Sequence, residues 1–227
     1  MSAPMPKEET RQHFDALAGD YDRWKEKSGY YYALLAEICR ELVPPGRSVL
    51  EVGCGTGTLL SRLSPRRGVG IDLSRRMVEI AAAKFPELSF LVADAENFDL
   101  DETFDYIIIP DVVEHLFDPG AMFRSVRKCC RPDTRVIVTC VNPLWAPVLH
   151  LAERLGMKMP EGEHRWLPES ELAAIAGEAG FRMDAAHGRI LLPKKVPLLS
   201  ATLNGAAAAF PFLKPLCLTQ ALVLIPR

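Results

Sequence analysis

The residues of this sequence that are best able to do chemistry lie in a glycine-rich stretch. Gly53, Gly55 and Gly57 follow a short apolar run and precede a segment of helical periodicity, as in a strand that turns tightly into a helix. Glycines adopt left-handed backbone angles without strain and let a ligand approach the main chain closely. On this stretch alone, a ligand-binding loop and a purely structural turn both stay open.

The spacing of the glycines selects among nucleotide-like ligands. A dinucleotide fingerprint, Gly-x-Gly-x-x-Gly, would need a third glycine where this sequence has Thr58. A phosphate-binding P-loop would need Gly-Lys-Ser or Gly-Lys-Thr after the glycines, and neither follows. The stretch therefore predicts a nucleotide-like ligand that carries no phosphate.

Three acidic residues stand at the ends of predicted strands. Glu51 can approach a cationic group directly or through water. Asp72 can accept from both hydroxyls of a ribose, with each charge-assisted bond contributing about 1.5 to 3 kcal/mol. Asp94 can accept from an adenine amino group, with the backbone of Ala95 nearby. S-adenosylmethionine presents all of these groups, so these acids favour it as the ligand.

Glu51, the glycine stretch, Asp72 and Asp94 together resemble the nucleotide-binding motifs of class I S-adenosylmethionine-dependent methyltransferases, over residues 21–180. In that family the acid after the second strand binds ribose and the acid after the third binds adenine. The resemblance implies a seven-stranded sheet whose last strand is antiparallel, and S-adenosyl-L-homocysteine as the product. Met77 is expected either over the adenine or in the core. The predicted cofactor residues are Glu51, Gly53, Cys54, Gly55, Gly57, Asp72, Leu73, Met77, Asp94, Ala95 and Asp111.

Methyl transfer from a sulfonium is an in-line displacement, for which positioning matters most and a base is optional. In a doubly wound sheet the pocket lies outside the carboxyl ends of the strands, which places Asp111 and Asn142 at its floor. Asp111 can orient the acceptor or begin a helix. His115 can take a proton from the acceptor. Because residues 111–116 resemble a segment of class I enzymes with quite different acceptors, a structural or cofactor-proximal role for His115 is also open.

Aromatic residues are the candidates for a cap over the site. The run from Phe14 to Trp24 resembles an N-terminal motif of many small-molecule methyltransferases, in which a tyrosine closes over the methyl-transfer site, and the likeness assigns that role to Tyr21. Tyr21 thus joins Asp111 and His115 as a candidate catalytic residue. The other residues predicted to contact the acceptor could instead serve helix packing or be solvated surface charges. Its predicted residues are Tyr21, Trp24, Tyr31, Asn142, Trp145, His164 and Trp166.

Along the sequence that must position these residues, short apolar runs alternate with amphipathic segments. This pattern predicts an α/β fold with a doubly wound, mostly parallel, Rossmann-like sheet in a single domain. A helical cap is expected at 1–46, the cofactor-binding core at 47–141, and acceptor-side insertions at 142–169 and 193–215. Strands are predicted at residues 48–52, 68–71, 89–92, 104–109, 134–140, 181–191 and 217–225. Helices are predicted within 7–42 and at 58–63, 74–84, 119–129 and 168–179, with Ser74 and Asp118 as caps.

The composition limits the partners. A net charge of -2 gives no broad attraction to phosphate backbones, so we expect no nucleic-acid substrate. The six cysteines form no Cys-x-x-Cys pair and no zinc-site spacing, which favours a reduced cytoplasmic location and no metal. No secretory signal or membrane span is predicted. The apolar connection 193–215 is expected to be a buried cap, with a dimer contact or a membrane-surface element as alternatives, and the oligomeric state stays open.

The acceptor is the least defined part of the prediction. Residues 30–32, 142–145 and 191–199 resemble, more weakly, bacterial methyltransferase modules that occur fused to or beside glycosyltransferases. The main hypothesis is therefore methyl transfer to an oxygen, nitrogen or carbon atom of a small-molecule or lipid- or sugar-linked acceptor. The alternative is a module that binds the cofactor as a regulatory or partner subunit without turnover.

Overall fold

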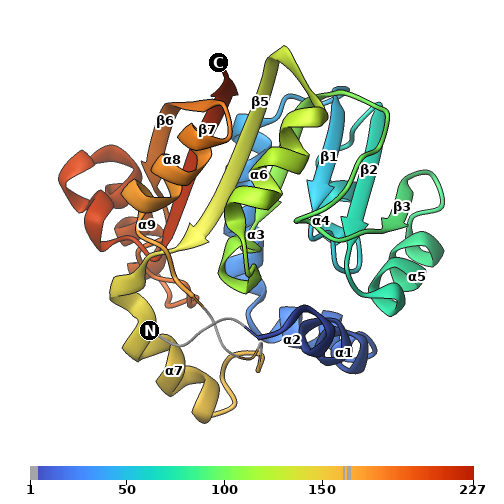
Figure 1. Ribbon diagram of the computed structural model, residues 1–227. Helices are drawn as coiled ribbons and strands as arrows, with labels where there is room; N and C mark the ends of the chain where they lie inside the picture. Colours follow the sequence, from blue (N-terminus) through green and yellow to red (C-terminus); the bar gives the residue numbers. More distant parts are fainter. Residues whose placement is uncertain (1–4, 161, 163–164) are drawn as a thin grey trace.

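A seven-stranded sheet forms the centre of the computed structural model, which describes residues 5–160, 162 and 165–227 (Figure 1). The strand order is β3-β2-β1-β4-β5-β7-β6, and β7 runs antiparallel to both of its neighbours. The predicted α/β sheet with an antiparallel last strand is therefore confirmed. The strands are β1 (Ser48–Val52), β2 (Arg67–Asp72), β3 (Ser89–Val92), β4 (Phe104–Pro110), β5 (Cys130–Val141), β6 (Phe181–Gly188) and β7 (Thr219–Pro226).

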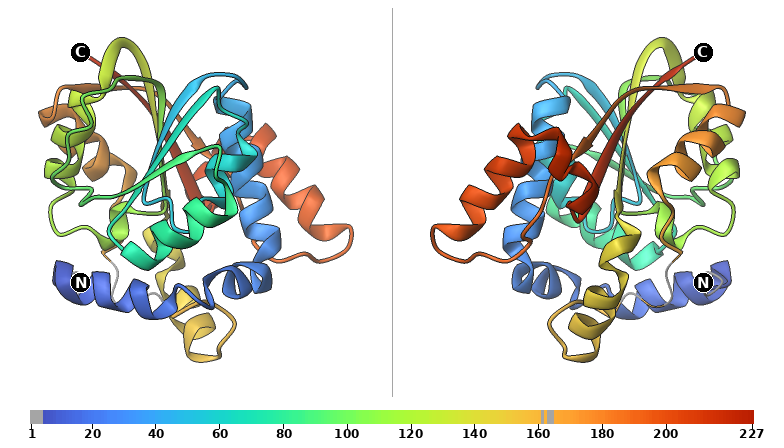
Figure 2. Two further views of the ribbon diagram at one scale, coloured as in Figure 1. Left: turned by 90° about the vertical axis from the view of Figure 1, so that its right-hand side faces the viewer. Right: turned by 90° about the vertical axis from the view of Figure 1, so that its left-hand side faces the viewer.

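Helices cover both faces of this sheet, as the uniformly apolar centre of β4 requires. Ile107 and Ile109 pack toward the helices α6 (Pro119–Lys128) and α8 (Glu169–Glu178), because successive side chains of a strand point to opposite faces. Ile108 packs toward α3 (Gly29–Leu42) and α4 (Thr58–Arg62). Figure 2 shows α3 on the side of the sheet opposite to α6 and α8. The helices that follow the parallel strands are α4 (Thr58–Arg62), α5 (Arg75–Lys84), α6 (Pro119–Lys128) and α8 (Glu169–Glu178).

Two helices begin at the predicted caps. The Ser74 hydroxyl accepts from the backbone N–H of Met77, 3.2 Å away, at the start of α5. The Asp118 carboxylate accepts from the backbone N–H of Ala121, at 3.0 Å, and Pro119 takes the first helical position of α6. Both caps confirm the sequence prediction.

The segments outside the sheet pattern hold additional short helices. The N-terminal part forms α1 (Lys7–Leu17), α2 (Tyr21–Lys27) and α3 (Gly29–Leu42). The insertion after β5 holds η2 (Pro143–Trp145) and α7 (Ala146–Arg154), and the connection between β6 and β7 holds α9 (Leu199–Ala209) and η3 (Pro211–Leu216). None of the helices within the described ranges has the length and apolar character needed to cross a membrane.

Two expectations for the C-terminal part are wrong. The strand predicted at 181–191 ends at Gly188. Arg189 N–H and the Ile190 carbonyl oxygen still bond to Thr219 and Leu218, but the backbone N–H groups of Leu191 and Leu192 donate to the Asn204 side chain. The connection 193–215 is not a buried cap, since Leu198 is 90% exposed and Phe212 is 73% exposed. Its sequence is apolar, but the helix α9 buries only Ser200 and Ala207.

The core on the α6 and α8 side offers a test of the packing. The ring of Phe181 on β6 is fully buried, and its centroid lies 5.9 Å from that of Phe123 on α6. We expect Phe181→Ala to lower the free energy of unfolding by about 3 to 5 kcal/mol in urea titrations. The control Met183→Ala, on the same strand but 44% exposed, should change it by less than about 0.5 kcal/mol. Equal effects of the two substitutions would contradict this packing.

Candidate functional site

A cavity of about 440 Å³ lies at the carboxyl ends of the parallel strands. Figure 1 shows α1, α2 and α7 lying across this edge of the sheet. On one side, the cavity is lined by acids and glycines from the ends of β1, β2 and β3, and on the other by aromatic and apolar side chains. The sheet topology thus brings together residues that are far apart in the sequence.

The glycine loop has the backbone geometry that the sequence indicates. Gly53, Gly55 and Gly57 have φ angles of +74°, +51° and +76°. Gly53 and Gly55 line the cavity, whereas a β-carbon at Gly57 would lie 2.6 Å from the ring of Phe90, so Gly57 serves the packing of the loop. Cys54 is also outside the cavity lining, with a buried side chain that faces Gly70.

Asp72 joins the loop to the sheet. One carboxylate oxygen accepts from the backbone N–H of Gly55 at 2.8 Å, and the other accepts from that of Ser74 at 2.9 Å. Burial raises the pKa of Asp72, and these two backbone hydrogen bonds oppose that shift. Asp72 lines the cavity, and each of its oxygens has a second lone pair that can accept from a ligand hydroxyl.

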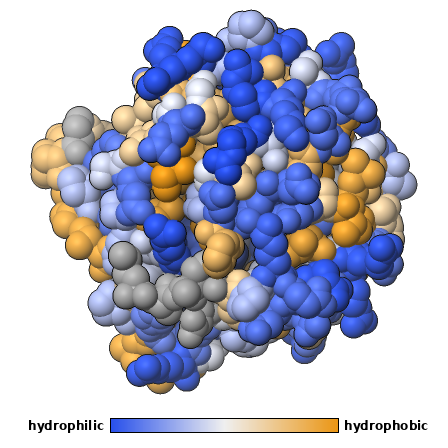
Figure 3. Space-filling model, in the orientation of Figure 1, coloured by the Kyte–Doolittle hydropathy of each residue, from blue (hydrophilic) through white to orange (hydrophobic). Residues whose placement is uncertain are grey.

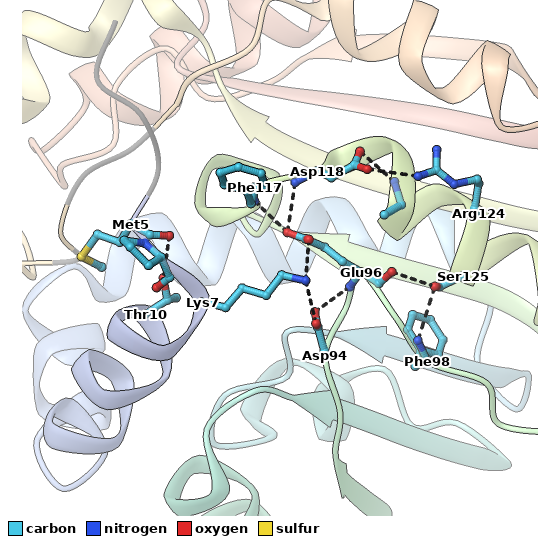
Figure 4. A network of polar contacts seen from close by, with 12 residues as sticks. Met5, Lys7, Thr10, Asp94, Glu96, Phe98, Phe117, Asp118, Arg124 and Ser125 are labelled. Carbon is cyan, nitrogen blue, oxygen red and sulfur yellow. Dashed lines mark hydrogen bonds and ion pairs between the residues drawn. The ribbon is translucent and has the colours of Figure 1, made fainter.

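Asp94 belongs to a network that the sequence did not reveal (Figure 4). The Lys7 ammonium, from α1, lies 2.8 Å from Asp94 and 2.7 Å from Glu96. Burial lowers the pKa of Lys7, but the hydrogen bonds to these two carboxylates outweigh it and raise the pKa. Glu96 also accepts from the backbone N–H groups of Phe117 and Asp118. Leu73, Met77, Ala93, Ala95 and Leu116 form the cavity wall around this network.

Glu51 is a carboxyl group with a strongly raised pKa. It is 2% exposed and accepts from the backbone N–H of Leu60 at 3.0 Å. Burial raises its pKa to about 8, against the opposing attraction of Lys25. A buried acid of this kind is stabilised in its ionised form by any cation that enters the cavity.

Lys25 is the cation that the sequence analysis missed. Its ammonium lies 4.6 Å from the ring centroid of Tyr21 and 4.8 Å from that of Tyr32. Burial lowers the pKa of Lys25, but the attraction of Tyr21, Glu51 and Asp111 outweighs it, so the pKa is raised. The spacing of Lys25 from Tyr21 could have predicted this position. Residues four apart on a helix share one face, and Tyr21 was already assigned to the site.

Side-chain bonds hold α2 over the glycine loop. The hydroxyl of Thr56 donates to Asp22 at 2.6 Å, and Lys84 of α5 pairs with the other oxygen of Asp22 at 2.7 Å. The ring of Tyr21 packs on the loop, since a β-carbon at Gly55 would lie 3.0 Å from it. The position of Lys25 in the cavity therefore follows from the bonds that join α2 to the glycine loop and to α5.

Asp111 orients a tyrosine rather than capping a helix. Its carboxylate accepts from the hydroxyls of Tyr31, at 2.6 Å, and Thr139, at 2.8 Å, and its φ angle is +52°. Burial, followed by the charge of Asp111, raises the pKa of Tyr31 well above its usual value, so the phenol stays protonated. His115 lies in η1 (Val113–His115) with its ring edge-on to Phe14, and both line the cavity.

The acceptor side of the cavity is aromatic and apolar. Trp24, Tyr31, Trp145 and Trp166 all line it. Trp145 donates to the carbonyl oxygen of Leu216 at 3.0 Å, which fixes its indole. Val148, Leu149, Ala152, Met157, Met159, Leu192 and Leu218 complete the wall. The predicted His164 lies outside the described residues.

The prediction that Asn142 lies at the floor of the pocket is wrong. Asn142 is 4% exposed and is not among the residues that line the cavity. Its amide nitrogen donates to the carbonyl oxygens of Pro215 and Cys217, and its oxygen accepts from Leu144 N–H. Asn142 thus ties the end of β5 to the segment before β7. Among the described residues, no group of histidine, cysteine or acidic side chains could hold a metal ion.

Comparisons with known proteins identify the class. A family model described as a methyltransferase domain matches residues 24–186, and the chain belongs to this family. A ubiquinone biosynthesis O-methyltransferase of Neisseria meningitidis serogroup A is 31% identical over 199 residues, which cover 74% of this chain and 80% of the relative. One from Xanthomonas axonopodis pv. citri is 26% identical over 81% of this chain and 85% of the relative.

Solved structures share the fold. An S-adenosylmethionine-dependent methyltransferase of Thermotoga maritima superposes with a TM-score of 0.72 at 19% identity, over 96% of this chain and 100% of the other. Magnesium protoporphyrin IX methyltransferase of Synechocystis, with bound S-adenosylhomocysteine, gives 0.71 at 18% identity, over 98% and 100%. The chain is therefore a class I S-adenosylmethionine-dependent methyltransferase.

The raised pKa of Glu51 predicts a pH dependence of stability. Its ordinary value is 4.5 and its value in the folded protein is about 8, so between these pH values the folded state binds the proton more tightly than the unfolded state. The contribution of Glu51 to the free energy of unfolding should therefore fall as the pH rises through this window. In urea titrations across the window, Glu51→Gln should gain stability relative to the unsubstituted protein as the pH increases. A difference that is independent of pH would refute the assignment.

Proposed function

We propose that this enzyme methylates a small-molecule or lipid- or sugar-linked acceptor and releases S-adenosyl-L-homocysteine. One observation carries the proposal: a single cavity joins the polar edge at Asp72 and Glu51 to an aromatic region around Trp24, Trp145 and Trp166. The polar edge suits the polar groups of the cofactor, and the aromatic region suits an acceptor with a flat or apolar part. The relatives that are named ubiquinone biosynthesis O-methyltransferases support a small-molecule acceptor.

The cofactor half has a partner for each polar group of S-adenosylmethionine. Asp72 accepts from the ribose hydroxyls, and Asp94 with the backbone of Ala95 binds the adenine. Glu51 faces the ammonium group. Lys25 supplies the positive charge for the carboxylate, a group for which the sequence analysis had found no partner. Gly53 and Gly55 let the ligand approach the main chain, while Leu73 and Met77 supply apolar contacts to the adenine.

The transfer itself needs alignment in a dry site. The acceptor atom forms a bond to the methyl carbon while the bond from that carbon to sulfur breaks, and the sulfonium becomes a neutral thioether. Tyr21 closes the cavity over the reacting atoms, and Asp111 orients Tyr31 toward the acceptor. His115 takes the proton that an oxygen or nitrogen acceptor releases. The roles of Tyr21, Asp111 and His115 are proposed because all three line the cavity.

A labelling experiment tests turnover. The protein is incubated with methyl-labelled S-adenosylmethionine and a cell extract that is separated into protein, aqueous and chloroform-soluble fractions. We expect label in a small-molecule or chloroform-soluble product, and none with Asp72→Asn. Label confined to protein would overturn the acceptor class. Cofactor binding without any label transfer would favour the alternative, a partner module without turnover.

The assignment of Lys25 gives a second prediction. Lys25→Met should weaken the binding of S-adenosylhomocysteine in titration calorimetry by at least about tenfold, the value of one charge-assisted hydrogen bond. It should leave the binding of 5′-methylthioadenosine, which lacks the carboxylate and the amine, unchanged.

Lys27→Met is the matched control, because Lys27 lies on the same helix with its ammonium 3.9 Å from the ring centroid of Trp24 and is outside the cavity lining. If Lys25→Met weakened both ligands equally, Lys25 would act on the fold of the site and not on the carboxylate.

A further inference from the structure

The helix α9 and the turn η3 form an exposed surface that the catalytic account does not use. We call it the α9 surface; its prominent apolar side chains are Val196, Leu198, Leu199, Phe210, Phe212 and Leu216. The exposed positions within the helix are Leu199, Ala201, Thr202, Gly205, Ala208 and Ala209, none of which carries a charge. Figure 2 shows α9 beside α3, projecting from the body of the molecule, and Figure 3 shows apolar surface at the left edge, where Figure 1 places α9.

The charged residues within the segment that carries this surface are all basic, while the neighbouring helix α3 carries Glu37 and Glu41, of which Glu41 pairs with Arg189. Residues 185–227 contain no aspartate and no glutamate. Lys194 and Lys195 precede the helix and are exposed, and they form no ion pair with any residue that the structure describes. Lys214 follows the helix and pairs with Glu169 of α8. An uncharged apolar helix is thus flanked by lysines.

The α9 surface is continuous with the mouth of the cavity. Leu192, Pro193 and Lys194 line the cavity, and the chain runs directly from them to Val196 and Leu198. The Ser200 hydroxyl fixes this path, because it donates to the carbonyl oxygen of Lys194 at 2.6 Å and accepts from the N–H of Val196 at 2.7 Å. Whatever covers the α9 surface therefore also lies next to the entrance of the site.

We propose that the α9 surface docks on a lipid bilayer that contains anionic headgroups. Exposed leucine and phenylalanine side chains enter the boundary between headgroups and acyl chains, while neighbouring lysines remain at the level of the phosphates. A second copy of the chain fits less well. In a two-fold dimer the same surface would face itself, and Lys194 and Lys195 would meet another set of lysines with no carboxylate from residues 185–227 to pair with them.

Docking in this way has a consequence for the acceptor, and this part rests on the proposed function. With the bilayer beside Pro193 and Lys194, an acceptor anchored in the membrane can enter the aromatic half of the cavity without leaving the lipid phase. The site would then select acceptors that carry a hydrocarbon chain. The docking itself does not depend on methyl transfer.

Vesicle co-sedimentation of the full chain, without cofactor, tests the docking. We expect binding to vesicles of equimolar phosphatidylcholine and phosphatidylglycerol. Leu198→Asn combined with Phe212→Ser should weaken it by at least about tenfold, since both apolar side chains lose their burial. Asparagine is chosen because the φ angle of Leu198 is +64°, a region that asparagine tolerates.

Two further variants complete the design. Lys194→Gln with Lys195→Gln should weaken binding to the mixed vesicles by about fivefold per lysine, with less effect on phosphatidylcholine alone. Phe117→Ser is the matched control, because Phe117 is 66% exposed but lies before α6, and it should bind as the unsubstituted protein does.

Several results would overturn the proposal. The first is a failure of the unsubstituted protein to bind mixed vesicles. The second is an equal loss of vesicle binding in Phe117→Ser and in the double variant with Leu198→Asn and Phe212→Ser. The third is a dimer in sedimentation equilibrium that this double variant abolishes. S-adenosylhomocysteine titrations of the same variants keep this test separate from the proposed function. The double variant with Leu198→Asn and Phe212→Ser should bind S-adenosylhomocysteine with unchanged affinity. If the unsubstituted protein did not bind S-adenosylhomocysteine, that result would contradict the proposed cofactor site and not the docking on a bilayer.

Discussion

The carboxylate of Asp72 is the point on which the cofactor side of this structure depends. It stands at the end of β2, accepts from the backbone N–H groups of Gly55 and Ser74, and so links the sheet to both the glycine loop and the start of α5. The N–H groups of Gly53 and Cys54 donate to the carbonyl oxygen of Ile71 beside it. A turn held by this many bonds is already ordered before a ligand arrives, which lowers the entropic cost of binding.

The second constraint is the concentration of buried acids at one edge of the sheet. Burial raises the pKa of Glu51 and of Asp72, and a buried carboxylate without a partner is unfavourable. The N-terminal helices bring in the opposing charges, because Lys7 pairs with Asp94 and Lys25 lies near Glu51. The cap formed by α1 and α2 is therefore part of the electrostatics of the site as well as its cover. Under the proposed function, the sulfonium of the cofactor would also stabilise the ionised form of these buried carboxyl groups.

Local patterns in the sequence were sufficient for the sheet and for the glycine loop. The apolar run at 104–109 predicted a strand, which helices cover on both faces, and Ser74 and Asp118 were recognisable as caps. Contacts between distant segments were not predictable in this way. Lys25 enters the cavity because Asp22 bonds to Thr56, and Asn142 leaves the pocket because carbonyl oxygens near β7 take its amide. The apolar composition of 193–215 suggested burial, although composition alone does not distinguish a covered helix from one whose partner lies outside the chain.

Titration calorimetry with S-adenosylhomocysteine on the unsubstituted protein and on Asp72→Asn tests directly whether Asp72 holds the cofactor. The substitution keeps the shape of the side chain but removes its charge and one of its two acceptor oxygens. We expect binding to the unsubstituted protein and a loss of affinity of at least about tenfold in Asp72→Asn, the value of a charge-assisted hydrogen bond to the ribose. Equal affinities in two folded proteins would show that the cofactor does not bind at the end of β2.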